Sequence, residues 1–491
     1  MYLSPTAGVF ADRSNLNEAK VLALMKARKM TQHTLPLDDA MALSNGLQSG
    51  TFTSFDIVSA YLERIRQQDK WLHCFVEVYE TEALAAAKAS DQLRKAGHTL
   101  GPLHGLPIAV KDLVDIAGKV TTIGSPLFAN NIAQSDAYLI QRLKAAGAII
   151  IGKTHMVQFA LGGWGTNEHM GMPRNPWDHQ VHRVPGGSSS GSAAAVAGGL
   201  VPLSIGTDTG GSVRLPAAYC GITGFKFTVN AMDTQGVAPL SKTLDSVGVF
   251  AKSMAEAAMV YDALVEDPNR ATSSHAMTAD SARALLQSLR IGRIATHELK
   301  DVQTEIVKAY EATLDFFESL GAHLSTIALP CSIADLAPVA INIMVTEGAA
   351  SYGALANDTS QPMDSGIRPR LQAGAKLLAT DYIAALEKQA LLKRQFAKAF
   401  EHIDIFATPT GLTTAVPMAE VNPSAPPVHF TRVLNVLDMC GVSVPVGLDA
   451  KHLPIGFQLG AAGGRDAFLI EVATAFQTLT QFHLASPKPK I

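Results

Sequence analysis

Two short loops hold the residues of this chain that are best suited to chemistry. Residues 186–192 read Gly-Gly-Ser-Ser-Ser-Gly-Ser, and residues 206–214 read Gly-Thr-Asp-Thr-Gly-Gly-Ser-Val-Arg. A serine hydroxyl is a weak nucleophile at pH 7, so these serines indicate catalysis only if a proton acceptor and an oxyanion site lie nearby. Glycines leave backbone N–H groups unobstructed, as an oxyanion site requires. The candidate oxyanion hole comprises Thr209, Gly210, Gly211 and Ser212.

A lysine is the candidate proton acceptor. Lys111 ends the apolar run Leu106–Val110, which predicts a buried strand. Burial disfavours the charged ammonium, so a lysine at the mouth of such a strand can lose its proton. The two loops and this lysine therefore predict a site in which a serine attacks a carbonyl group.

The two loops resemble those of the amidase signature family almost without change. Further segments resemble the same family, so that the resemblance covers roughly residues 50 to 480. They are Gly101-Pro-Leu-His-Gly-Leu-Pro-Ile-Ala-Val-Lys111-Asp, Gly152-Lys-Thr-His-Met-Val-Gln-Phe159, Arg174-Asn-Pro-Trp-Asp178, Pro216-Ala-Ala-Tyr-Cys-Gly-Ile-Thr-Gly-Phe-Lys226 and Leu453-Pro-Ile-Gly-Phe-Gln458.

The resemblance implies a role for three residues. In the family a lysine, a serine held by a cis peptide and a nucleophilic serine act together, and the two serines are 24 positions apart. Ser212 matches the nucleophile, Ser188 the bridging serine and Lys111 the base. The implied activity is hydrolysis of the carbon–nitrogen bond of a small amide through an acyl-enzyme on Ser212, with no cofactor and no metal. The sequence leaves open whether the Gly187-Ser188 peptide or its neighbour is the cis bond.

The same resemblance implies substrate contacts. It suggests Met156, Trp164 and Gly187 as substrate-binding residues, and it places residues 341–356, 367–377 and 434–439 around the pocket without assigning single residues. A core position is about as common for a tryptophan such as Trp164. Aryl amides, primary carboxamides and carbamates remain open as substrates, with esters as side substrates.

Other interpretations of the same residues compete. Residues 187–191 also fit the Gly-x-Ser-x-Gly nucleophile elbow, with Ser189 as nucleophile, but the preceding His182-Arg-Val-Pro185 is not the apolar strand that an elbow needs. Lys226 is a rival base, and Cys220 is more typical of a small buried thiol. Asp208 and Arg214 flank the nucleophile, and we expect them to pair or to cap backbone groups.

Histidines raise the question of a metal site or a Ser-His-Asp triad. His104, His155, His169, His179 and His182 lie in the matched part of the chain. They form neither a His-Glu-x-x-His motif nor another ligand cluster, so we expect packing or surface positions.

Composition is that of an enzyme with a large core. The 491 residues are 47% hydrophobic and 17% charged, with a net charge of −3 that gives no sign of nucleic-acid binding. Four scattered cysteines show neither metal spacing nor a disulfide-dense pattern. No secretory signal and no apolar run of about 18 residues are apparent, so we expect a cytoplasmic protein without a membrane partner. A homodimer is left open.

The elements around these loops predict an α/β fold. Apolar runs at 106–110, 148–151, 201–205 and 403–407 indicate buried strands, and residues 15–30, 37–45, 53–68, 136–146 and 192–198 indicate helices, with Ser54 as an N-cap. The resemblance implies a large mixed β-sheet covered by helices on both faces. We expect residues 1–70 to be a helical section packed on the core and 71–491 to be one catalytic domain.

Two alternatives to a stand-alone amidase remain. The first is the glutaminase subunit of a tRNA-dependent amidotransferase, which uses the same three residues to release ammonia for a partner. Phe227 stands where the family commonly has proline, which weakens any assignment to a subfamily. The second is an amidase-like binding scaffold without activity, which the presence of all three catalytic residue types disfavours.

Overall fold

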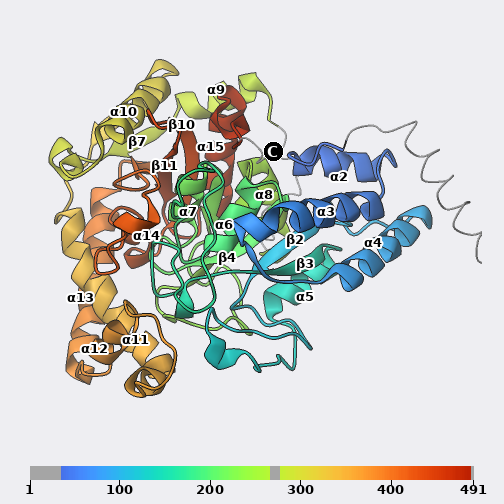
Figure 1. Ribbon diagram of the computed structural model, residues 1–491. Helices are drawn as coiled ribbons and strands as arrows, with labels where there is room; N and C mark the ends of the chain where they lie inside the picture. Colours follow the sequence, from blue (N-terminus) through green and yellow to red (C-terminus); the bar gives the residue numbers. More distant parts are fainter. Residues whose placement is uncertain (1–34, 266–276, 488–491) are drawn as a thin grey trace, which may run out of the picture. The chain divides into compact units, whose positions relative to one another are not determined.

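A mixed sheet of eleven strands forms the centre of the structure (Figure 1). The computed structural model describes residues 35–265 and 277–487. In order across the sheet, the strands are β1 (Phe75–Val78), β3 (Ile149–Thr154), β2 (Pro107–Lys111), β4 (Leu203–Asp208), β6 (Ser246–Ala251), β5 (Thr223–Lys226), β10 (Cys440–Leu448), β11 (Pro454–Ala461), β9 (Ile405–Pro409), β7 (Arg290–Arg293) and β8 (His323–Thr326).

Strand direction brings two loops to one edge of this sheet. β2 runs parallel to both β3 and β4, whereas β4 and β6, like the pairs through β5, β10, β11 and β9, are antiparallel. Val110 of β2 pairs with Ile205 of β4, so the two strands end at nearly the same level. Because parallel strands point the same way, the last residue of β2, Lys111, lies beside the end of β4 and the glycine-rich loop that follows it.

Helices surround the sheet, which confirms the predicted α/β fold. They are α2 (Ala40–Gln48), α3 (Ser54–Leu72), α4 (Glu80–Lys95), α5 (Tyr138–Ala145), α6 (Ser190–Ala197), α7 (Arg214–Cys220), α8 (Met254–Leu264), α9 (Ala279–Gln287), α10 (Thr304–Ser319), α11 (Ala337–Asn357), α12 (Arg368–Gly374), α13 (Ala379–Ala399), α14 (Thr431–Val436) and α15 (Asp466–Leu479). In Figure 1, α3 and α4 lie near the β2 and β3 end of the sheet, and α10 to α13 lie at the other end.

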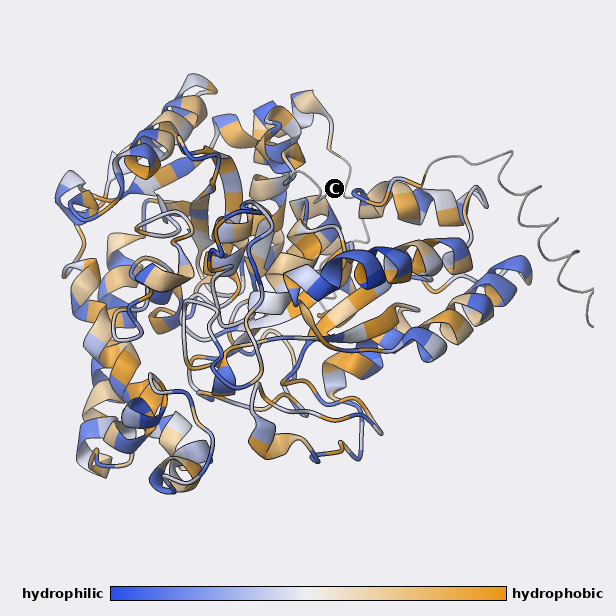
Figure 2. Cartoon of the chain, in the orientation of Figure 1, coloured by the Kyte–Doolittle hydropathy of each residue, from blue (hydrophilic) through white to orange (hydrophobic). Residues whose placement is uncertain are grey.

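Helix α6 follows the first serine loop and lies deepest against the sheet. All eight of its residues are buried, and it packs on β2, β3, β4 and β6. Its small residues make this possible, since a Cβ atom on Gly191 would lie 2.4 Å from the Cys74 carbonyl oxygen. Figure 2 shows the apolar colour on β2 and β3 and mixed stripes on α4, as expected for buried strands beside an amphipathic outer helix.

The predicted elements match the observed ones with small shifts at their ends. The runs expected to be strands fall on β2, β3, β4 and β9, and the helical patterns at 37–45 and 53–68 fall on α2 and α3. The N-cap of α3 is Thr53 rather than Ser54, because the Thr53 hydroxyl accepts from the Asp56 N–H. The helix expected at residues 15–30 lies outside the described residues.

One helical stretch departs from the expected absence of a long apolar segment. Among the described residues, Ile333–Asn357 is long and apolar enough to cross a membrane. Length and composition do not distinguish a membrane span from a core helix. Its main part, α11, packs against α12, α13 and α14. These contacts are those of a helix that builds a wall of the protein.

Candidate active site

Lys111 lies at the end of β2 with its amine directed at a serine. Its Nζ lies 2.8 Å from Ser188 Oγ and 2.9 Å from Thr207 Oγ1, and the side chain has no solvent exposure. The strand pairing explains this position, because β2 and β4 run side by side and Thr207 belongs to β4. The structure therefore brings the predicted base and the predicted bridging serine into hydrogen-bond contact.

Burial makes this lysine a base near neutral pH. Desolvation lowers the pKa of Lys111 to about 7, although the carboxylates of Asp245 and Asp208 act in the opposite direction. Its two hydrogen-bond partners, Ser188 and Thr207, are neutral hydroxyls. Neither provides the negative charge that would hold the ammonium protonated. A substantial fraction of Lys111 is consequently neutral at pH 7.

Ser188 is held by an unusual backbone. The Gly187–Ser188 peptide is cis, which settles the choice that the sequence left open. Gly186 has a φ of +78°, and the Gly187 N–H donates to the Gly163 carbonyl over 2.8 Å. A Cβ atom on Gly187 would lie 2.7 Å from the Gly165 nitrogen. Two glycines in succession are therefore required for the chain to enter this turn.

Ser212 lies in the loop after β4 at the edge of a cavity. It is 7% exposed, whereas Ser188 is fully buried. The two serine loops are joined by a backbone bond of 3.4 Å, from the Ser189 N–H to the Ser212 carbonyl. Among the site serines, Ser212 is the one that a substrate in this cavity can reach.

A buried ion pair fixes the shape of the Ser212 loop. Asp208 accepts the N–H groups of Gly211 and Val213, and its carboxylate lies 2.8 Å from Arg214 Nη2. Burial raises the pKa of Asp208, but the Arg214 guanidinium outweighs this effect and holds that pKa well below its usual range. Pairing and capping, as expected for Asp208 and Arg214, are both confirmed.

The candidate oxyanion donors differ in availability. The Gly211 N–H is already used by Asp208. In the part of the chain that the structure describes, the N–H groups of Thr209, Gly210 and Ser212 have no acceptor, and all three residues line the cavity. The structure thus corrects the prediction for Gly211, because its conformation and not its N–H is what the loop needs.

The rival catalytic residues have other contacts. The buried Ser189 hydroxyl donates to the Thr207 carbonyl over 3.2 Å, which leaves it unsuited to the nucleophile elbow. Lys226 Nζ donates to the Phe227 and Met439 carbonyls over 3.0 and 2.8 Å. The Cys220 thiol is buried, as expected, and burial raises its pKa.

The histidines do not contact the candidate site. His155 stacks on His73 at 4.2 Å, and burial lowers the pKa of His155 to about 3. One group of possible metal ligands occurs among the described residues, where Glu168, His169 and Asp364 come within 4.8 Å of one another. Glu168 and Asp364 already accept hydrogen bonds between two loops, and Glu168 is exposed. This group therefore serves as a contact between the two loops.

The cavity beside Ser212 encloses about 460 Å³ including its mouth. Its lining residues come from parts of the chain that lie far apart in the sequence. They are Ala160, Leu161, Gly162, Gly163, Thr209, Gly210, Ser212, Leu244, Ala340, Met344, Arg370, Pro426, Val428 and Arg432. Its walls are mostly apolar, with two arginines and no carboxylate among them.

The predicted substrate contacts lie beside this cavity and not on its surface. Met156 is buried, and its carbonyl accepts from Asn167. Trp164 donates from Nε1 to the Asn422 carbonyl over 2.8 Å and packs on the cluster that includes Val428. Gly187 supports Ser188 from behind. Roles for these three residues in substrate binding stay predictions.

Sequence reasoning did not identify several residues of the site. Thr207, the second partner of Lys111, was visible in the loop motif but had no assigned role. Asp245 accepts from Thr209 Oγ1 over 2.5 Å, and burial raises its pKa to about 6. Arg370 and Arg432 line the cavity more than 150 positions after Ser212. Met344 and Arg370 do fall in the segments that the resemblance placed around the pocket.

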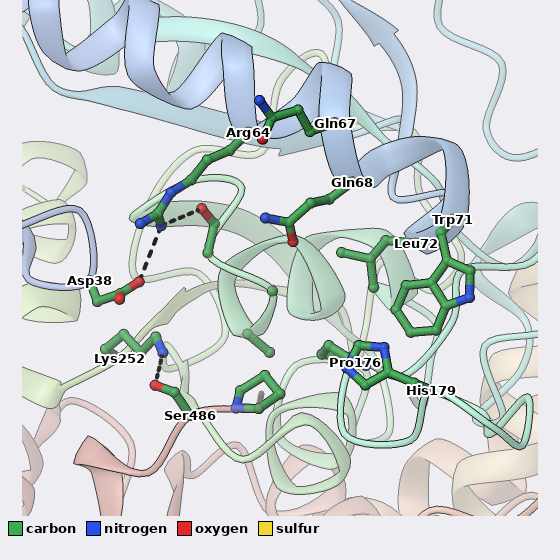
Figure 3. A pocket seen from close by; sticks show the side chains of 14 residues that line it. Asp38, Arg64, Gln67, Gln68, Trp71, Leu72, Pro176, His179, Lys252 and Ser486 are labelled. Atoms are coloured by element: carbon green, nitrogen blue, oxygen red, sulfur yellow. Dashed lines mark hydrogen bonds and ion pairs between the residues drawn. The ribbon is translucent and has the colours of Figure 1, made fainter. Parts of the chain in front are cut away.

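A second cavity, drawn in Figure 3, is separate from this site. In it, Lys252 donates to Ser486 Oγ over 2.7 Å, and Arg64 bonds to Asp38 Oδ1 and the Gly199 carbonyl. None of the three candidate catalytic residues lines it. Its side chains link α3 to later segments of the chain.

Comparisons with known proteins agree with this geometry. The family described as Amidase matches residues 56–470. A glutamyl-tRNA(Gln) amidotransferase subunit from Carboxydothermus hydrogenoformans is 32% identical over 481 residues, covering 91% of this chain and 98% of that protein.

Solved structures with the same fold include two with known settings. One chain, from a vestigial protein complex that reveals the evolutionary origins of an s-triazine catabolic enzyme, has a TM-score of 0.81 and 29% identity, covering 92% of this chain and 100% of that chain. Native peptide amidase from Stenotrophomonas maltophilia has a TM-score of 0.78 and 27% identity, covering 92% and 98%.

Proposed function

The chain belongs to the amidase family, and from that premise we propose that it hydrolyses the carbon–nitrogen bond of an amide through an acyl-enzyme on Ser212. One observation carries the proposal. Lys111, fully buried and with a pKa near 7, contacts Ser188 at 2.8 Å in the loop that adjoins Ser212. A neutral amine placed on a hydroxyl is what activation of a serine requires.

Acylation follows from this arrangement. Neutral Lys111 takes a proton from Ser188, and Ser188 takes one from Ser212 as the Ser212 oxygen bonds to the amide carbon. The free N–H groups of Thr209, Gly210 and Ser212 stabilise the oxyanion. When the carbon–nitrogen bond breaks, the relay returns a proton to the nitrogen, and ammonia or an amine leaves. Water then attacks the ester, and Ser212 recovers its proton as the acid departs.

A second candidate is favoured by the sequence relatives. Those at 32 to 34% identity are named as that same subunit of glutamyl-tRNA(Gln) amidotransferase. In that role the amide is glutamine, and the ammonia passes to a partner protein. Full-length coverage of these relatives supports this candidate more strongly than it supports any particular small amide. The resemblance to a peptide amidase supports an enzyme that acts alone.

The inactive scaffold is disfavoured by the geometry. A scaffold has no need to bury a lysine amine against two hydroxyls, since the desolvation of a lysine costs free energy that no ion pair offsets here. Localisation in the cytoplasm, absence of a membrane or nucleic-acid partner, and homodimer formation stay proposals.

Labelling with a fluorophosphonate probe tests the proposed mechanism. Intact-protein mass spectrometry should show a single adduct on the wild type that is lost in Ser212→Ala, weakened in Lys111→Ala and kept in Ser189→Ala. Loss in Ser189→Ala with labelling kept in Ser212→Ala would revive the nucleophile elbow. No labelling at all would favour the scaffold.

Ammonia release separates the two enzymatic candidates. The purified chain alone should release ammonia or amine from small amides. Activity confined to glutamine, and raised by a partner protein, would instead favour the glutaminase candidate.

A further inference from the structure

Two guanidinium groups line the cavity that contains Ser212. Arg370 comes from α12 and Arg432 from α14, and both side chains are half-buried. None of the other residues that line this cavity is acidic. The mouth of the candidate site is therefore cationic, although the chain as a whole carries a net charge of −3.

The two arginines differ in what they bind. Arg370 donates from Nη1 to the Leu161 carbonyl over 3.3 Å and from Nη2 to the Pro423 carbonyl, so that it holds two loops that border the cavity. Within the described residues, the guanidinium of Arg432 has neither a hydrogen-bond acceptor nor an ion-pair partner. Its five N–H donors are unused by the protein.

Such an arrangement is costly unless a ligand completes it. Removing a guanidinium from water without a partner loses hydration free energy, and a like charge nearby adds repulsion. Burial lowers the pKa of Arg432 to about 10, and the charge of Arg370 contributes in the same direction. Arg432 is still protonated at pH 7, so its charge awaits an anion.

Resting on the proposed function, we propose that the amide substrate carries a carboxylate on its acyl part, which Arg432 binds while the amide carbonyl meets Ser212. The substrate class is then a monoamide of a small dicarboxylic acid. A planar guanidinium binds a carboxylate through two parallel hydrogen bonds, which fixes the ligand as well as attracting it. A cavity of about 460 Å³ including its mouth accepts a chain of four or five carbons.

The same surroundings disfavour a free amino group on the ligand. Glutamine is glutaramate with an added ammonium, and no carboxylate lines the cavity to receive that ammonium. Two guanidinium groups would repel it. The ranking expected from the lining is therefore glutaramate before both glutamine and the neutral valeramide.

Calorimetric titration of the Ser212→Ala protein tests this ranking without turnover. The ligands are succinamate and glutaramate, the neutral isosteres butyramide and valeramide, and glutamine. We expect each monoamide to bind at least about tenfold more tightly than its neutral isostere. Equal affinity for the neutral amides, tighter binding of glutamine, or no binding of either monoamide would overturn the inference, and the second of these results would favour the glutaminase candidate.

Substitution of Arg432 in the same background separates charge recognition from structure. Arg432→Met should abolish the preference for the charged ligand and leave valeramide affinity unchanged, and Arg432→Lys should retain part of the preference. If Arg432→Met weakened both ligands alike, or neither, the arginine would not be the carboxylate site.

Labelling distinguishes failure of this inference from failure of the proposed function. The neutral fluorophosphonate probe should modify Ser212 in Arg432→Met as it does in the protein with Arg432 intact. Labelling with no preference for a charged ligand rejects the carboxylate site alone. Absence of labelling with the ligand ranking intact rejects the acyl-enzyme and keeps the anion site.

Discussion

Arg214 and Asp208 form an ion pair of 2.8 Å in which neither side chain is exposed to solvent. Arg214 also donates to the Thr431 carbonyl and to the side chains of Gln458 and Asn435. Through these bonds, the Ser212 loop is tied to α14 and β11, which lie more than 200 positions later in the chain. The reactive loop is thus positioned by distant parts of the fold.

Removing one partner of this pair should destabilise the protein strongly. Arg214→Met leaves the Asp208 carboxylate buried without a cation, which typically costs about 3–5 kcal/mol of unfolding free energy. Urea denaturation followed by fluorescence would measure the loss, and fluorophosphonate labelling of Ser212 should decline with it.

An exposed ion pair is the matched control for this substitution. Arg290 also binds a carboxylate with two nitrogens, at Asp404, but its side chain is 47% exposed. Arg290→Met should change stability far less, since solvent screens such a pair. Equal losses in the two variants would show that burial of the Arg214 pair is not what stabilises the loop.

The local parts of the site could be predicted from the sequence. Lys111 ends an apolar run, and the serines and glycines form continuous motifs, so that both their positions and their chemistry are written in short segments. The cis peptide at Ser188 and the use of the Gly211 N–H by Asp208 could not be assigned, because both depend on contacts made after folding.

The cavity walls could be predicted only in part. Arg370 falls in a segment that the family resemblance placed near the pocket, but Arg432 sits in the six-residue helix α14, where no periodic pattern marks it. Strand β10 was missed for a related reason. It contains Gly441, Pro445 and Gly447, which are typical of loops, and pairing with β5 and β11 overrides that preference.

The pH dependence should follow the titration of Lys111. Burial lowers its pKa to about 7, so the protonated fraction grows as the pH falls through 7, and a protonated amine cannot accept the Ser188 proton. We expect kcat/KM to fall about tenfold per pH unit below about pH 6 and to level off above about pH 8. A pH–rate profile with its maximum below about pH 5 would contradict this role.

Gly211→Ala should distort the Ser212 loop. Gly211 has a φ of +130°, and an added Cβ would lie 2.0 Å from Thr431 Oγ1, whose hydroxyl donates to the Gly210 carbonyl. We expect a lower melting temperature together with a loss of Ser212 labelling. Gly210→Ala is the control for stability, because nothing lies within 4 Å of its added Cβ. If both variants melted like the wild type, the steric argument would fail.

Lys226 offers the sharpest test of which lysine is the base. Burial lowers its pKa to about 8, close to that of Lys111, so a pH profile alone does not separate the two. Its amine, however, donates to the Phe227 and Met439 carbonyls and holds β5 near α14. Lys226→Met should therefore lower the melting temperature while the remaining folded protein keeps the wild-type acid midpoint of kcat/KM. Lys111→Ala should lower kcat by at least about 100-fold with little change in melting temperature. A shifted midpoint in Lys226→Met, with activity kept in Lys111→Ala, would assign the base to Lys226 instead.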